Sequence, residues 1–260
     1  MIQRERIINK VAIDIQKPAT GPIIYWMERD QRVEENWAII YGLEQARKHQ
    51  VPLIVSCILA SANYEQLSTR QQQFMLTGLK ELEQQLFNLN IQFILQTGEP
   101  ITYIPELIKQ TQASMLITDF NPLRYRQQWN EKLIQLLDVP IIEVDAHNVI
   151  PCWIASNKQE YGAYTIRPKI HRLLSLYLTD FPKLQPNSYG ERLQYLNSAM
   201  QELDNFINNK LQYYNQRRNA QQQMHNLTYH HTCTLDNYQR SASHGKCCIV
   251  MPVKIIKMHS

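Results

Sequence analysis

The stretch GPIIYWM at residues 21–27 decides the fold class, because a short apolar run is typical of a strand that is buried on both faces. Four similar runs follow it, and segments with helical spacing lie between them. The runs are VPLIVSCIL (51–59), IQFILQT (91–97), SMLITD (114–119) and VPIIEVD (139–145), and the helices are expected over 33–49, 69–89, 101–110 and 123–137. This alternation predicts an α/β domain over residues 20–146, built on a five-stranded parallel doubly wound (Rossmann-like) sheet.

Charged residues stand at the carboxyl ends of these predicted strands, where doubly wound sheets bind their ligands. Arg29 and Asp30 follow the first strand, and Asp119 closes the fourth. Taken alone, Arg29, Asp30 and the neighbouring Arg32 are best interpreted as surface ion pairs and as a helix cap by Asp30; the alternative is that they line a ligand cleft. The segment YWMERDQRV contains no glycine, which argues against a dinucleotide-binding turn or a P-loop.

The composition narrows the class of protein further. Hydrophobic residues make up 44% of the chain and the formal net charge is +4. Five cysteines lack the spacing of a disulfide framework, and no apolar run approaches the roughly 20 residues needed to span a bilayer. The start of the chain, MIQRERIINK, scatters charges among its apolar residues, unlike a secretory leader. We therefore expect a cytoplasmic protein with no membrane partner.

The strand–helix alternation stops after residue 146. Residues 1–19 are interpreted as an N-terminal extension and residues 147–190 as an interdomain linker, helical near 168–177. Residues 191–219 are expected to form the first helix of a second, helical domain, because apolar residues recur there at spacings of three or four. These residues are Leu196, Met200, Leu203, Ile207 and Leu211.

Three long segments resemble class II cyclobutane pyrimidine dimer DNA photolyases. They are IIYWMERDQRVEENWA (23–38), VIPCWIASNKQEYGAYTIRPKI (149–170) and LDNFINNKLQYYNQRRN (203–219). Their order and separation also fit that family, and the resemblance covers roughly residues 20–219. It implies that the α/β domain is the amino-terminal antenna domain, followed by the helical start of an incomplete FAD-binding domain.

The resemblance also implies a function, deoxyribodipyrimidine photo-lyase activity, in which bound FAD uses light to repair cyclobutane pyrimidine dimers in damaged DNA. It further implies that the protein is a monomer. Tyr214 would contact FAD, and Arg218 and Asn219 would lie near the flavin and the lesion. Arg29, Asp30 and Asp119 would line a cleft for an antenna chromophore, in some members a deazaflavin. Without the resemblance, Arg217 and Arg218 would be interpreted as the basic end of a helix.

The resemblance fails abruptly after Asn219, where the family continues with Asp-Pro and a Ser-rich loop for the flavin phosphates. If codons are chosen for residues 220–244 and read from the third base of the Ala220 codon, they encode PTTNAQSNLSPYLHFGQLSAQRVA, which resembles the missing segment. Loss of one A from GAC-CCA would convert Asp-Pro into the observed Ala-Gln. Residues 220–260 are therefore interpreted as an out-of-frame tail.

This interpretation makes the histidines and cysteines of the tail an accident of translation, so no metal site is predicted. The chain itself is expected to be an inactive fragment of a photolyase, since most of the flavin-binding domain would be missing. The alternative is a non-catalytic α/β module that binds an antenna chromophore or a nucleotide.

Overall fold

The computed structural model describes residues 3–9, 20–60 and 67–189, with single positions between 203 and 222. It separates into two units, Met1–Ile207 and Asn208–Ser260. In the second unit, every described position is helical. The described positions between residues 203 and 219 are also helical, which agrees with the helix predicted over 191–219. The full extent of that helix stays a prediction.

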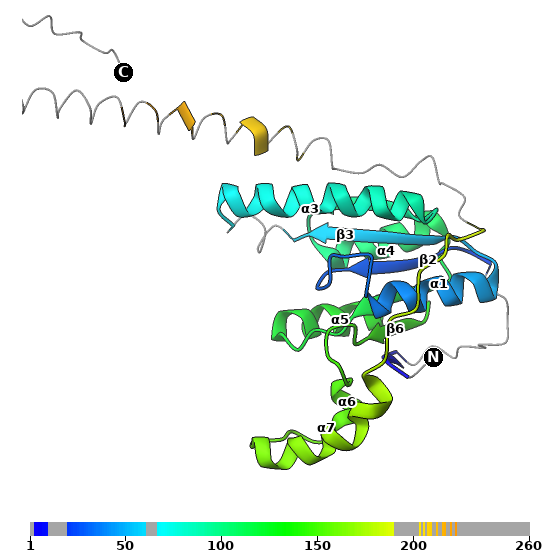
Figure 1. The fold of residues 1–260 in the computed structure, drawn as a ribbon. Coiled ribbons are helices and arrows are strands. Elements are labelled where there is room, and N and C mark those ends of the chain that lie inside the picture. Colours follow the sequence, from blue (N-terminus) through cyan, green and yellow to red (C-terminus); the bar gives the residue numbers. More distant parts are fainter. Residues whose placement is uncertain are drawn as a thin grey trace, which may run out of the picture. The chain divides into compact units, whose positions relative to one another are not determined.

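The first unit is built on one six-stranded sheet (Figure 1) with the strand order β1-β6-β5-β2-β3-β4. Five of the strands are parallel neighbours, and they coincide with the five predicted apolar runs. Every residue of β2, β3, β5 and β6 is buried, which explains why their sequences are continuously apolar. The five are β2 (Ile23–Met27), β3 (Leu53–Leu59), β4 (Gln92–Thr97), β5 (Met115–Asp119) and β6 (Ile141–Val144).

The sixth strand corrects the prediction for the start of the chain. Strand β1 (Glu5–Ile7) pairs antiparallel with β6, in the register Glu5↔Val144. The segment expected to be an extension therefore contributes an edge strand to the sheet. Sequence patterning missed it because β1 has three residues, none of them fully buried.

Helices cover both faces of the sheet (Figure 1). Right-handed crossovers place α1 (Trp37–His49) and α3 (Thr69–Asn88) on one face, and α4 (Pro100–Thr111) and α5 (Arg124–Leu136) on the other. The α4–α5 face packs on side chains such as Ile24, Trp26 and Ile54. These four helices agree with the predicted ranges to within four residues.

The start of α1 differs from the prediction. The helix begins at Trp37 instead of residue 33, because Glu35 has a left-handed backbone (φ 54°) and Asn36 is the cap. The Asn36 side chain accepts hydrogen bonds from the N–H groups of Ala38 and Ile39 at 2.8 and 3.2 Å. The predicted capping by Asp30 is therefore wrong.

The predicted linker contains two helices, α6 (Cys152–Ala155) and α7 (Ala163–Tyr177). After α7, the chain runs alongside α1 from its first turn to its last. Phe181 packs on Trp37 with 4.6 Å between ring centroids, and Arg47 donates a hydrogen bond to the carbonyl of Gln185. The part of the linker that follows α7 therefore lies against α1.

Candidate functional site

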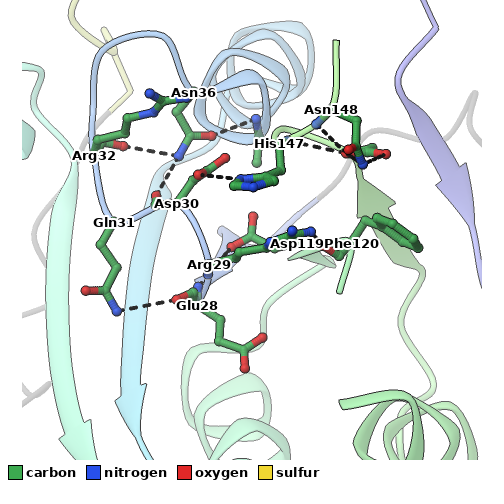
Figure 2. Close-up of polar contacts among 12 residues, drawn as sticks. Glu28, Arg29, Asp30, Gln31, Arg32, Asn36, Asp119, Phe120, His147 and Asn148 are labelled. Carbon is green, nitrogen blue, oxygen red and sulfur yellow. Dashed lines mark hydrogen bonds and ion pairs between the residues drawn. The ribbon is translucent and has the colours of Figure 1, made fainter. Parts of the chain in front are cut away.

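The candidate site lies where the strand order changes direction, between β2 and β5. Crossovers leave these two strands toward opposite edges of the sheet, so a crevice is expected beyond their carboxyl ends. Glu28, Arg29 and Asp30 follow β2, and Asp119 is the last residue of β5 (Figure 2). The structure thus brings together the three residues predicted to line a cleft: Arg29, Asp30 and Asp119.

Asp119 is the buried centre of this site. One carboxylate oxygen, Oδ2, accepts hydrogen bonds from the N–H groups of Glu28 and Arg29 at 3.0 and 2.8 Å. The other, Oδ1, accepts from the Tyr25 hydroxyl at 2.7 Å. Burial raises the pKa of Asp119, and these three hydrogen bonds oppose that rise. Asp119 therefore fastens the turn after β2 to the end of β5.

Asp30 and Asn36 continue the network toward the β6 side of the crevice. The Asp30 carboxylate lies 3.3 Å from Nδ1 of His147, and its backbone carbonyl accepts from the Asn36 amide at 3.0 Å (Figure 2). Asp145, which follows β6, is fully buried, and its carboxylate accepts from the N–H groups of Asn148 and Cys152. The loop after β6 is thereby held against the loop after β2.

Arg29 borders the site with a partly exposed guanidinium, which donates to the carbonyl of Phe120 at 3.2 Å. The Phe120 ring meets Trp153 edge-on at 5.4 Å, and the guanidinium of Arg6 stacks on Trp153 at 4.4 Å from its centroid. Strand β1 and the linker helix α6 therefore contact each other at one edge of the site.

Comparison with known proteins shows which family the chain belongs to. The sequence model of the DNA photolyase family matches residues 23–187. The chain belongs to the DNA photolyase family. The match includes the whole parallel part of the sheet and almost all of the linker.

Curated relatives in this family are named deoxyribodipyrimidine photo-lyase. The protein from Arabidopsis thaliana is 41% identical over 185 residues, covering 70% of this chain and 37% of the relative. The protein from Potorous tridactylus is 41% identical over 173 residues, covering 66% of this chain and 32% of the relative. This photolyase-family chain therefore spans about a third of the length of these relatives.

A solved structure confirms the fold alone. A bacterial class III photolyase from Agrobacterium tumefaciens superposes with a TM-score of 0.50 at 20% sequence identity. The superposition covers 69% of this chain and 36% of the other one. The mostly parallel α/β sheet is thus shared with a photolyase.

The structure does not test the residues predicted to contact flavin and lesion. Tyr214 and Arg218 lie outside the described residues. Asn219 is described, as an exposed helical position in the second unit. The histidines and cysteines of the tail also lie outside, and among the described residues no group of three or more His, Cys, Asp or Glu could hold a metal ion. No helix in the described part of the photolyase chain is long and apolar enough to cross a membrane.

Sequence reasoning missed Arg126, the fully buried cation of α5. Its guanidinium stacks 3.6 Å from the centroid of the Trp26 ring and forms an ion pair with Glu28. It also donates to Asn130 at 2.6 Å and to Thr118 at 2.5 Å. The segment RYRQQW resembles a solvated first turn, so only the tertiary structure shows that Arg126 fixes Glu28 at the crevice.

A second polar cluster joins the two linker helices and has a testable pH dependence. Lys169 donates to Glu160 at 2.5 Å and to Ser156 at 2.9 Å. Hydrogen bonds from Lys169, Thr165 and Ser156 lower the pKa of Glu160 to about 2 from an ordinary value of 4.5. Because the pKa of Glu160 is lower in the folded protein, its ionised form stabilises the fold at every pH above its ordinary pKa of 4.5. This contribution disappears as the pH falls from 4.5 to about 2.

We therefore expect Glu160→Gln to lower the thermal unfolding midpoint at neutral pH and to converge with the parent protein as the pH falls. Circular dichroism melts between pH 7 and pH 3 measure this difference. The matched control is the uncharged change Gln159→Ala at the exposed position next to it, which should leave the pH profile unchanged. A difference between Glu160→Gln and parent that stays constant over the whole range would contradict the assignment.

Proposed function

We propose that this chain is the amino-terminal part of a class II deoxyribodipyrimidine photo-lyase, which repairs cyclobutane pyrimidine dimers in damaged DNA by light. The identity of about 41% to two proteins of that name carries the proposal. The class II assignment rests on the segments 23–38, 149–170 and 203–219. In such an enzyme, bound FAD supplies the excited-state electron that splits the dimer.

Two parts of the chain would bind different ligands. The crevice bordered by Arg29, Asp30 and Asp119 is the place for an antenna chromophore, because it combines a topological switch point with partly exposed polar groups. Tyr214 would contact FAD, and Arg218 and Asn219 would contact the flavin or the lesion. These three assignments rest on the third matching segment alone.

The interruption after Asn219 is proposed to be a one-base deletion. Reading residues 220–244 in the alternative frame gives a peptide with the sequence SNLSPYLHFGQ, which suits a flavin-phosphate loop. Two bases of almost every shifted codon are fixed by the observed residues, so a chance run of this length is improbable. The 260-residue chain by itself should therefore lack light-driven repair.

Sequencing the gene across the codons for Asn219 and Ala220 tests this proposal. We expect an extra base in a corrected sequence, or an open frame that continues as PTTNAQSNLSPYLHFGQ. The frame-restored protein should purify with FAD and split dimers in an oligonucleotide under blue light, whereas the 260-residue chain should do neither. Stoichiometric FAD and dimer splitting by the 260-residue chain would overturn the proposed loss of activity.

A second candidate function is a non-catalytic module that binds an antenna chromophore or a nucleotide. The position of the crevice favours it, because the residues that border the crevice all belong to the first unit. A chromophore that purifies with the chain without FAD would support this alternative. For either function, we propose that the protein is a cytoplasmic monomer. Damaged DNA is proposed as a partner only of the complete photolyase.

A further inference from the structure

The turn after β2 is the place where doubly wound nucleotide-binding proteins hold a phosphate, using backbone N–H groups of the turn and of the helix that follows. Two N–H groups of the turn and two of the helix are occupied in this chain. Asp119 accepts from the N–H groups of Glu28 and Arg29. Asn36 accepts from those of Ala38 and Ile39 in the first turn of α1.

Tyr25 connects these two acceptors. Its hydroxyl donates to Asp119 at 2.7 Å and accepts from the Asn36 amide at 3.3 Å. Asp119, Tyr25 and Asn36 are at most 2% exposed. A ligand phosphate could reach these N–H groups only by displacing a buried carboxylate and a buried amide, each of which would lose its partners.

The charges around the turn act in the same direction. Asp30 lies close enough to Asp119 that its charge adds to the rise that burial causes in the pKa of Asp119. Of the basic side chains nearby, the His147 ring lies 3.3 Å from the Asp30 carboxylate, and Arg29 donates to the Phe120 carbonyl. A dianion at the turn would therefore face the carboxylates of Asp30 and Asp119, which repel it.

We propose that Asp119, Tyr25 and Asn36 form an internal plug that takes the position of a ligand phosphate, so that the crevice accepts a heteroaromatic chromophore that carries no phosphate at this turn. The inference rests on the proposed antenna cleft and names its ligand class. It makes Asp119 and Asn36 specificity-determining residues, and it disfavours the nucleotide-binding alternative.

The test uses riboflavin and FMN, which differ only by a phosphate, together with inorganic phosphate alone. For the 260-residue chain, FMN should bind no more tightly than riboflavin in a fluorescence titration. Millimolar inorganic phosphate, at ionic strength matched with chloride, should leave the thermal midpoint unchanged. A preference for FMN of about tenfold or more, which is the gain expected from charge-assisted hydrogen bonds, would overturn the proposal.

The double variant Asn36→Gly, Asp119→Ala removes both acceptors, and glycine is tolerated at a helix cap. We expect it to gain about tenfold in affinity for FMN over riboflavin and to be stabilised by inorganic phosphate. If it is folded by circular dichroism and gains neither, the proposal is wrong. If the double variant does not fold, the relative affinities of the parent protein for FMN and riboflavin still test the proposal.

These outcomes are separate from those of the proposed repair activity. A frame-restored protein that repairs dimers but whose α/β domain prefers FMN would overturn the plug and leave the photolyase proposal intact. A frame-restored protein that does not prefer FMN and shows no repair would overturn the photolyase proposal and leave the plug intact.

Discussion

Replacing Arg126 by methionine is expected to lower the free energy of unfolding by about 3–5 kcal/mol, the range found when one partner of a buried ion pair is removed. The change leaves the Glu28 carboxylate without its cation, and Thr118 and Asn130 without their donor. It also removes the guanidinium that covers the Trp26 ring. Urea unfolding followed by circular dichroism measures the loss.

Two further variants separate the ion pair from the packing. Arg124→Met, two residues earlier on the same helix and exposed, should change the free energy of unfolding by less than about 0.5 kcal/mol. The double variant Arg126→Met, Glu28→Leu should lose less than Arg126→Met alone, because it leaves no unpaired buried charge. A loss of under about 1 kcal/mol for Arg126→Met would show that the network does not stabilise the fold.

Gly21→Ala is expected to destabilise the protein by about 3 kcal/mol or more, at the upper end for overpacking. A Cβ atom at this position would lie 1.8 Å from the backbone oxygen of Gln112 and 2.8 Å from its carbonyl carbon. Backbone atoms cannot move aside as a flexible side chain does. The close approach is also held in place by Ser114, whose hydroxyl donates to the Gly21 carbonyl at 2.8 Å.

Gly78→Ala is the matched control, and its expected effect has the opposite sign. Gly78 lies inside α3, and an added Cβ there would meet nothing within 4 Å. Alanine is favoured over glycine in a helix interior by about 0.8–1 kcal/mol, so the variant should be more stable than the parent. Equal effects of the two substitutions in urea titrations would refute the steric argument for Gly21.

The parallel sheet could be predicted from the sequence because strands buried on both faces leave continuous apolar runs. The same logic brought Arg29, Asp30 and Asp119 together, since carboxyl ends of parallel strands meet at one edge. The cap of α1 could not be predicted, because Asp30 and Asn36 are both good caps and only the left-handed turn at Glu35 selects Asn36. Arg126 was hidden for a different reason: burial of an arginine depends on partners that are distant in the chain.

The pairing of β1 with β6 has a consequence for how the protein is made. Arg4 donates to the carbonyl of Asn148, a residue 144 positions further along the chain. Because synthesis proceeds toward the carboxyl end, β1 emerges before β6 and must wait unpaired until β6 has been synthesised. We infer that docking of β1 is among the last steps in the co-translational folding of this sheet.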